Sequence, residues 1–301
     1  MGSMFSRRHP FLFFILIFTA IVAAATVLTS LMGLVDKEKR ELRFGEKVGV
    51  IEIEGMTTDA REIIGQIKSF REQTGIKAIV LRINSPGGPV GPAQEIYREI
   101  EKTVKEKKVV ASLGTIAASG GYYVASSADR IMANPGTITG SLGVIMGYTN
   151  FQELFKKIGL SPVIIKSGEY KDIASPVREM SDKERELLQA FTDNIHTQFI
   201  ADVAKGRGES PEAIRKIADG RIFSGETAME YGLVDRLGNL ADAVEWAGRM
   251  GGIEGRIKTV YPPEKKLPIL DYMMDMAAAK IKAAAEEMTS VTPGYIYEPG
   301  Y

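Results

Sequence analysis

Short apolar runs that alternate with helix-length segments constrain the fold of this chain most strongly. The run Ala78–Ile83 is almost continuously apolar and has the length of a strand buried on both faces of a sheet. Comparable runs occur at Val48–Ile53 and Val109–Leu113. Helices are expected between them, over roughly Asp59–Gln73 and from near Pro92, a residue that suits the first turn. This alternation predicts an α/β fold built from parallel βαβ units.

The alternation continues toward the C-terminus. A helix is expected to begin at the segment around Ser119, and short strands are expected at Arg130–Ala133 and Val163–Ile165. Ser181-Asp182-Lys183-Glu184 is a capping-box pattern, which predicts the start of a long helix over Ser181–Lys205. Further helices are expected from Ser210 and over Asn239–Met250, with two further elements, Ser224–Tyr231 and Leu233–Asp235, between them.

Composition excludes several kinds of chemistry. The chain has no cysteine, which rules out thiol proteases, disulfides and cysteine-based zinc sites. Its two histidines are His9, which lies in the N-terminal leader, and His196, so a histidine-based triad would have to use His196. Lys and Arg together number 38, equal to Asp plus Glu, and this balance gives no reason to expect nucleic acid as a partner. We expect neither a cofactor nor a metal ion.

The N-terminal segment has the length of a membrane span. Residues 11–34 are almost wholly apolar and carry no charge, which predicts a transmembrane anchor rather than the shorter core of a cleaved signal peptide. Cleavage near Ala23-Ala24-Ala25 stays open as an alternative. Residues 1–10 form a tail that begins with an apparent cloning remnant, Met1-Gly2-Ser3, and residues 35–47 form a charged linker. Basic residues flank the span on both sides, so their count does not fix its orientation.

Ser119 lies in the segment Ala117-Ala118-Ser119-Gly120-Gly121-Tyr122-Tyr123. Small residues at a strand-to-helix junction let other backbone approach closely. They also place the hydroxyl at a helix N-terminus, where free N–H groups can stabilise an oxyanion. The segment taken alone fits a helix cap equally well.

Two further segments carry candidate chemistry. Asn84-Ser85-Pro86-Gly87-Gly88 follows a buried strand and could present backbone N–H groups to an anion, although a plain turn would have the same sequence. Lys171 lies in Ser167-Gly168-Glu169-Tyr170-Lys171-Asp172. A lysine acts as a general base only if burial or a nearby positive charge lowers its pKa, and Lys166 is a local competitor.

These segments together resemble the short-form signal peptide peptidase A family of membrane serine proteases, over about Glu46–Gly251. The resemblance rests on the three segments above and on two more, Thr139-Gly140-Ser141-Leu142-Gly143-Val144 and Gly232-Leu233-Val234-Asp235. It implies a crotonase/ClpP-like fold of repeated ββα units, with residues 48–261 as the catalytic domain and residues 262–301 as a C-terminal extension.

The resemblance also implies roles for individual residues. Ser119 would be the nucleophile and Lys171 its general base, with Ser141 holding the lysine amine. Gly87 or Gly88, together with the N–H of Gly120, would line the oxyanion hole. The protein would be a homo-oligomer in the cell membrane with an extracytoplasmic catalytic domain, in which serine and lysine come from neighbouring subunits. Its substrates would be apolar peptides, notably remnant signal peptides.

Other interpretations stay open at this point. An NfeD-type membrane protease would share the Ser-Lys chemistry, but no second long apolar run follows residue 34. A crotonase-type acyl-CoA enzyme would use the same paired N–H groups without needing the anchor. A scaffold with a decayed site would not be expected to keep both Ser119 and Lys171. The tail at Tyr295–Tyr301 could be disordered, or it could occupy a neighbour's substrate groove as an extended strand.

Overall fold

The computed structural model describes residues 45–263, the isolated positions 19, 23, 276, 279 and 280, and the backbone of residues 294–296. The chain divides into two compact units, Met1–Glu46 and Lys47–Tyr301. The expected anchor at residues 11–34 lies outside the described residues except for two positions. Within the described part of the chain, no helix combines the length and apolar character needed to cross a membrane.

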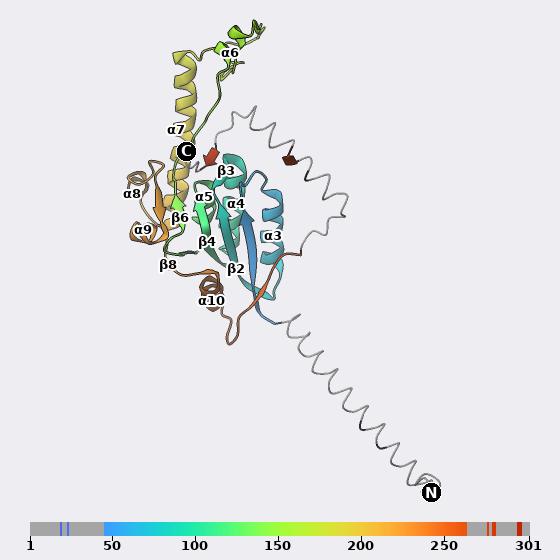
Figure 1. The fold of residues 1–301 in the computed structure, drawn as a ribbon. Coiled ribbons are helices and arrows are strands. Elements are labelled where there is room, and N and C mark those ends of the chain that lie inside the picture. The colour runs from blue at the N-terminus through green and yellow to red at the C-terminus, as the bar shows by residue number, and fades with distance from the viewer. Residues whose placement is uncertain are drawn as a thin grey trace, which may run out of the picture. The chain divides into compact units, whose positions relative to one another are not determined.

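An eight-stranded sheet lies at the centre of the second unit (Figure 1). Its main path runs β7-β6-β4-β2-β1-β9, while β5 pairs with β4 and β8 pairs with β5. All of these pairs are parallel except β6 with β7. The predicted α/β fold with a mostly parallel sheet is confirmed. The strands are β1 (Lys47–Glu54), β2 (Ile76–Ser85), β4 (Lys108–Ala118), β5 (Arg130–Ala133), β6 (Ile138–Gly140), β7 (Ile222–Ser224), β8 (Arg236–Leu237) and β9 (Lys258–Val260).

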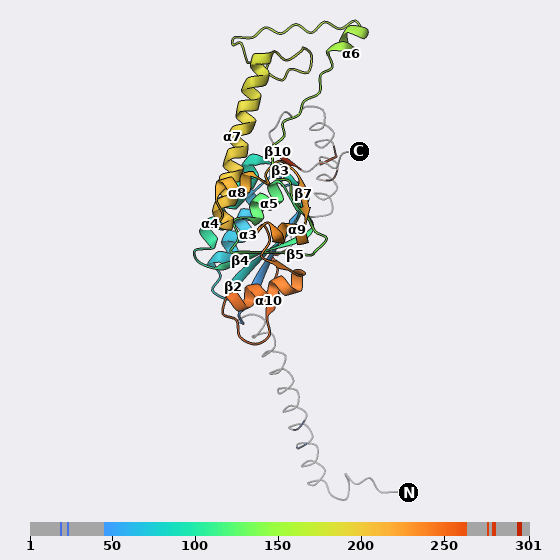
Figure 2. The ribbon, with the colours of Figure 1, turned by 90° about the vertical axis from the view of Figure 1, so that its left-hand side faces the viewer.

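Helices cover both faces of the sheet (Figures 1 and 2). Residues of α3, α4, α5 and the C-terminal part of α7 share one hydrophobic cluster with the strands, and α10 packs in a second cluster. The bounds of α3, α4, α7 and α10 agree closely with those expected from the sequence, whereas α6 was not expected. The helices are α3 (Arg61–Glu72), α4 (Val90–Thr103), α5 (Gly120–Ala125), α6 (Gln152–Lys157), α7 (Asp182–Arg207), α8 (Pro211–Arg215), α9 (Gly225–Glu230) and α10 (Leu240–Met250).

The central strands explain why two layers of helices are needed. Alternate residues of β2 point to opposite faces, so Ile79 and Leu81 belong to the cluster with α3 and α4, whereas Ala78 and Val80 belong to the cluster with α10. All four side chains are fully buried. A strand that is apolar on both faces must be covered on both, as the run Ala78–Ile83 predicts.

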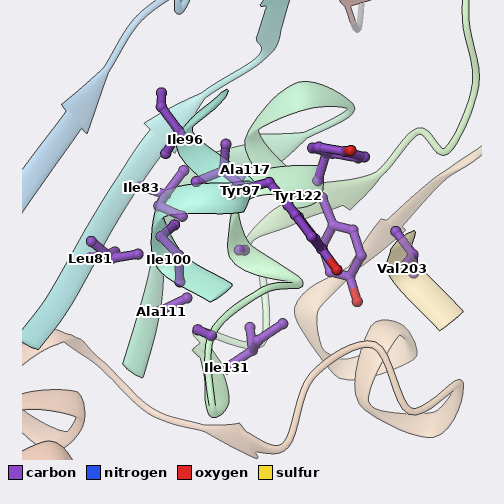
Figure 3. Packing of buried hydrophobic residues seen from close by; sticks show 14 of the residues in the cluster. Leu81, Ile83, Ile96, Tyr97, Ile100, Ala111, Ala117, Tyr122, Ile131 and Val203 are labelled. Carbon is purple, nitrogen blue, oxygen red and sulfur yellow. The ribbon is translucent and has the colours of Figure 1, made fainter. Parts of the chain in front are cut away.

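The larger cluster joins the sheet to the helices nearest Ser119. Figure 3 shows side chains from β2, α4, β4, α5, β5 and α7 packed together. Aromatic rings lie at its centre: the ring centroid of Tyr123 is 4.9 Å from that of Tyr97 and 5.1 Å from that of Phe199. α4, α5 and α7 therefore share one core.

Strand β4 places the candidate nucleophile. One of its edges pairs with β2, while the other pairs first with β5, over Val110–Leu113, and then with β6, over Ile116–Ala118. The strand ends at Ala118, immediately before Ser119. Ser119 thus lies at the carboxyl end of a central strand, with the end of β6 beside it.

The segment between β6 and α7 differs most from expectation. The predicted strand at Val163–Ile165 is wrong, because residues 158–181 contain no helix or strand. Val163 is 84% and Ile165 is 97% exposed. β-branched residues favour a strand only where neighbouring strands and a covering layer give them partners, and this segment has neither. Together with α6 and the N-terminal part of α7, it projects away from the sheet (Figures 1 and 2). We call residues 145–191 the arm.

Candidate active site

Ser119 occupies a strained turn between β4 and α5. Its backbone angles are φ 53° and ψ −118°, a conformation that residues other than glycine rarely adopt. The turn is held by two backbone hydrogen bonds, from the Ser119 N–H to the Gly140 carbonyl and from the Tyr123 N–H to the Ser119 carbonyl, each 2.8 Å long. Backbone strain of this kind persists where the surroundings enforce it, and it clusters at functional sites.

The Ser119 hydroxyl is buried and has no hydrogen-bond partner. It is the only buried side-chain nitrogen or oxygen in this condition among the described residues. Leaving a buried polar group unsatisfied costs about 1–3 kcal/mol, so such an atom calls for an explanation. A helix-capping serine would accept an N–H of the first turn, and Ser119 does not. The helix-cap interpretation of Ser119 is therefore wrong.

Three contacts fix α5, and with it the position of Ser119. A Cβ added at Gly121 would lie 2.6 Å from the Ser85 carbonyl oxygen, so only glycine allows this approach between α5 and the end of β2. The Tyr122 hydroxyl donates to the Leu233 carbonyl at 2.8 Å, and the Tyr123 hydroxyl donates to the Asp202 carboxylate. Both tyrosines are fully buried.

The glycine loop lies against the same helix. It forms the short strand β3 (Gly87–Pro89), which contacts α5. Gly87 has φ 118°, and a Cβ on Gly88 would lie 2.7 Å from the Thr57 carbonyl oxygen, so both positions require glycine. The Gly87 N–H already donates to the Ser85 hydroxyl at 3.2 Å. Gly120 begins α5, whose first N–H groups have no acceptor within the helix. The oxyanion roles of Gly87, Gly88 and Gly120 stay predictions.

The segment Gly294–Ile296 forms β10, which pairs antiparallel with β3 in the same chain. Tyr295 is the register partner of Gly88, and β10 also contacts α5. Part of the expected C-terminal extension thus lies as an extended strand on the glycine loop of its own chain. The expectation that it enters a neighbour's groove stays a prediction.

Ser141 lies beside Ser119. In the pairing of β4 with β6, Ala118 is opposite Gly140, so the residues that follow them, Ser119 and Ser141, come next in register. Ser141 is 6% exposed, and its φ of 52° also lies in the left-handed region. Its N–H donates to the Arg221 carbonyl at 2.8 Å. The structure therefore brings the two serines together.

Lys171 does not share this location. The neighbouring carboxylate, Asp172, pairs with Arg178, which pairs with Glu184 in the first turn of α7. At the other end of α7, Asp202 accepts a hydrogen bond from the hydroxyl of Tyr123. Tyr123 lies on α5, the helix that follows Ser119. Asp202 follows Glu184 by 18 positions, which corresponds to about 27 Å along the helix axis. Within one chain, Lys171 is thus on the arm and far from the serine.

His196 approaches the site from α7. Its Nε2 is 3.2 Å from the carbonyl oxygen of Leu142, the residue after Ser141. This contact holds the chain beyond β6 against α7. The histidine thus has a packing contact with backbone rather than a contact with either serine hydroxyl, which gives no support to a histidine-based triad.

Comparison with known proteins identifies the family. The sequence profile of Peptidase family S49 matches residues 101–253, about half of the chain, and that of Clp protease matches residues 46–137. A protein of Synechocystis sp. that carries a protease name is 44% identical over 210 residues, which cover 69% of this chain and 76% of that protein. The chain belongs to peptidase family S49.

Other S49 relatives share the same region. Protease 4 of Salmonella typhi is 33% identical over 253 residues, covering 81% of this chain and 40% of the relative. Serine protease SPPA of Arabidopsis thaliana chloroplasts is 32% identical over 206 residues, covering 68% and 30%. This chain therefore spans less than half of these two longer relatives. The resemblance to the signal peptide peptidase A family is confirmed, and the protein is a serine peptidase.

Sequence reasoning missed Asp202, a buried acid that contacts the helix after Ser119. Asp202 is 8% exposed and carries the hydrogen bonds of Tyr123 and Arg98. One signal was present: Asp202 lies on the same helical stripe as Ile195 and Phe199, where an acid must find a partner. The partner itself could not be identified, because Tyr123 and Arg98 are distant in sequence.

Proposed function

We propose that this S49 peptidase cleaves apolar peptides with Ser119 as nucleophile and Lys171 as general base, the lysine being supplied by a neighbouring subunit. The observation that carries the proposal is the Ser119 hydroxyl, buried and without a hydrogen-bond partner in the described residues, on a strained turn beside a glycine loop. Such a hydroxyl has hydrogen-bonding capacity that a general base would satisfy.

The chemistry follows from the surroundings of Ser119. The lysine amine would accept the Ser119 proton as Oγ attacks the scissile carbonyl, and would return it to the leaving amine. The N–H groups of Gly88 and Gly120 would stabilise the resulting oxyanion. Ser141 would accept a hydrogen bond from the lysine amine and orient it. The acyl-enzyme is then hydrolysed by water in the same way.

The position of Lys171 supports an active site shared between subunits. Lys171 is exposed and lies on the arm, far from Ser119 of its own chain. The arm also carries many exposed apolar side chains, a combination that marks protein–protein contact surfaces. Those most exposed are Leu154, Ile158, Leu160, Val163 and Ile165. A second copy of the chain that covers them would bring Lys171 to a serine, as the resemblance implies for a homo-oligomer.

A peptide main chain would bind along β3. The antiparallel pairing of Gly294–Ile296 with Gly87–Pro89 shows that this edge can accept an extended segment. A substrate in the same place would pass close to the N-terminus of α5. We expect small or apolar side chains in the substrate, with remnant signal peptides as the physiological class. Anchoring by residues 11–34 in the cell membrane, with the catalytic domain outside the cytoplasm, belongs to the same proposal.

The decisive experiment mixes two impaired variants. S119A should abolish hydrolysis of an apolar peptide ester, and K171A should leave only a small residual rate. After co-refolding in equal amounts, activity should return, because a K171A subunit keeps the serine and an S119A subunit keeps the lysine. Random assembly would make about a quarter of the sites competent in a symmetric oligomer. No recovery in assembled mixtures would contradict sharing between subunits, and full activity of K171A alone would refute the base.

A further inference from the structure

The loop that carries Lys171 has little regular structure to hold it. Residues 158–181 contain no helix or strand, and successive turns provide the backbone hydrogen bonds around the lysine. The Lys171 N–H donates to the Gly168 carbonyl at 3.2 Å, and the Ile173 N–H donates to the Tyr170 carbonyl at 3.1 Å. Exposed turns of this kind open easily, so a fixed position for Lys171 depends on side chains.

Arg178 supplies that restraint, and all of its N–H donors are used. Nε donates to Asp172 Oδ2 at 2.8 Å, and Nη2 donates to the Asp172 carbonyl at 3.0 Å. Nη1 donates to the Glu179 carbonyl and to Glu184 Oε2, both at 2.9 Å, and Nη2 also donates to the second Glu184 oxygen. Only a guanidinium has five donors in one plane, so a lysine could not make this set of contacts.

Glu184 anchors the guanidinium to a rigid element. It lies in the first turn of α7 and is 3% exposed, and its carboxylate also accepts the Ser181 N–H at 2.9 Å in the capping box. A carboxylate at this position also interacts favourably with the helix dipole. Arg178 thus joins both the backbone and the side chain of Asp172, the residue after Lys171, to the start of a 26-residue helix.

The two candidate lysines, Lys166 and Lys171, differ in their hydrogen bonds to this network. The Lys166 ammonium donates to Asp172 Oδ1 at 2.6 Å and to the Glu169 carbonyl at 2.7 Å. Two of its three protons are therefore engaged, and it acts as a cation that binds Asp172. Among the described residues, none accepts a hydrogen bond from the Lys171 ammonium, so that group is available to reach a serine.

We propose that Arg178 is a positioning residue for Lys171, which it holds in place by tying Asp172 to Glu184 at the start of α7. This inference rests on the proposed role of Lys171 as general base. Arg178 would contact neither the substrate nor Ser119. Its contribution is the placement of the base, so its loss should slow the chemical step rather than weaken substrate binding.

The test compares R178K with R249K. Arg249 makes a similar set of contacts on α10, to Glu245 Oε1 and to the Ile253 carbonyl, but on the opposite face of the sheet from Ser119. R178K should lower kcat by about 10- to 100-fold, the effect expected of a misplaced catalytic group, and leave KM within about 2-fold. R249K should leave both unchanged. Equal kcat values for the two variants, measured on assembled protein, would overturn the proposal.

A second comparison separates this inference from the proposed function. In a K171A background the residual rate should not change when R178K is added, because Arg178 would act only through the lysine. If R178K lowers that residual rate by the same factor as in the wild type, Arg178 acts elsewhere and the proposal fails. Full activity of K171A alone would instead refute the assigned base. Should R178K not assemble, E184Q breaks the same link with less change in shape and replaces it in both comparisons.

Discussion

The Tyr123 hydroxyl donates a hydrogen bond to the Asp202 carboxylate and so joins the helix that follows Ser119 to α7. The same carboxylate accepts two hydrogen bonds from Arg98 of α4, at 2.9 and 2.8 Å. Three helices therefore meet at one acid. Because α7 also carries the end of the arm, this contact connects the candidate nucleophile to the element that supports Lys171.

Tyr123→Phe should destabilise the protein more than Tyr122→Phe does. Tyr123 donates to a charged acceptor, and such bonds contribute roughly 1.5–3 kcal/mol, whereas Tyr122 donates to the neutral Leu233 carbonyl, a bond of about 1 kcal/mol. Urea unfolding followed by circular dichroism measures both changes in the free energy of unfolding. Equal losses would show that the charged acceptor at Asp202 adds nothing beyond a neutral carbonyl.

Gly121→Ala should impair both stability and activity. The added methyl group would lie 2.6 Å from the Ser85 carbonyl oxygen and would push α5 away from the glycine loop. We expect a loss of roughly 1–3 kcal/mol, typical of overpacking, together with a fall in kcat. Gly91→Ala is the matched control, because a Cβ there meets nothing within 4 Å and α4 should gain about 0.5–1 kcal/mol. A G121A variant as active and stable as wild type would contradict the close approach.

The ion pairs of the arm should lose their stabilising effect in acid. Hydrogen bonds from the Arg178 guanidinium and the Ser181 N–H lower the pKa of Glu184 from 4.5 to about 2. Hydrogen bonds from Arg178 and Lys166 likewise lower the pKa of Asp172 below its ordinary value. A lowered folded-state pKa stabilises the protein above the unfolded pKa, and this contribution is lost as the pH falls through the folded pKa.

The difference in Tm between wild type and E184Q should therefore be constant at neutral pH and shrink between about pH 4.5 and pH 2. Thermal melts over this range test it. E153Q serves as the control, since Glu153 is 74% exposed and pairs only with Lys156 on α6. A difference that does not change down to pH 2 would show that Glu184 titrates without affecting the fold.

Peptidase activity should rise toward alkaline pH. A lysine base is active only when deprotonated, so the rate should follow the loss of its proton. The measurement is kcat/KM for a peptide ester across the stability range of the protein. A limb near pH 6.5, where an ordinary histidine titrates, would argue against a lysine. H196N should leave the profile unchanged, because His196 contacts the Leu142 carbonyl and neither serine.

Removal of residues 293–301 should speed the cleavage of short peptides. β10 occupies the β3 edge on which a substrate would pair, so its loss frees the binding surface. We expect a lower KM, with kcat changed less, because the tail competes for binding without taking part in the chemistry. A chain that ends at residue 298 retains β10 and is the control. Identical kinetics for the two truncated chains would show that the tail does not compete.

The sequence predicted the parallel sheet and the setting of Ser119 because both depend on local signals. Apolar runs of strand length, such as Ala78–Ile83, require burial on two faces, and small residues before Gly120 and Gly121 suit a sharp strand-to-helix turn. The strand expected at Val163–Ile165 failed for the opposite reason. Its residues have strand propensity, but the structure provides no neighbouring strand or layer to pair with them.

Contacts between residues that are far apart in the sequence could not be predicted from local sequence patterns. The pairing of Ala118 with Gly140 sets Ser141 beside Ser119, and this depends on the register of two strands rather than on either motif. The contacts of Asp202 and Arg178 likewise join residues whose partners no periodicity specifies. The distance of Lys171 from Ser119 follows from the length of α7, which the capping box predicted without showing where the arm would point.

That distance has a consequence for how the proposed enzyme would be controlled. A folded single chain holds the proposed base, Lys171, and the proposed nucleophile, Ser119, near opposite ends of α7. Such a chain would be inert toward its neighbours from synthesis onward, without needing a propeptide. Turnover per chain should then fall when the protein is diluted below the concentration at which its copies associate. The local concentration of the protein would then control proteolysis. If the chain is anchored as proposed, the number of copies per membrane area would set the rate.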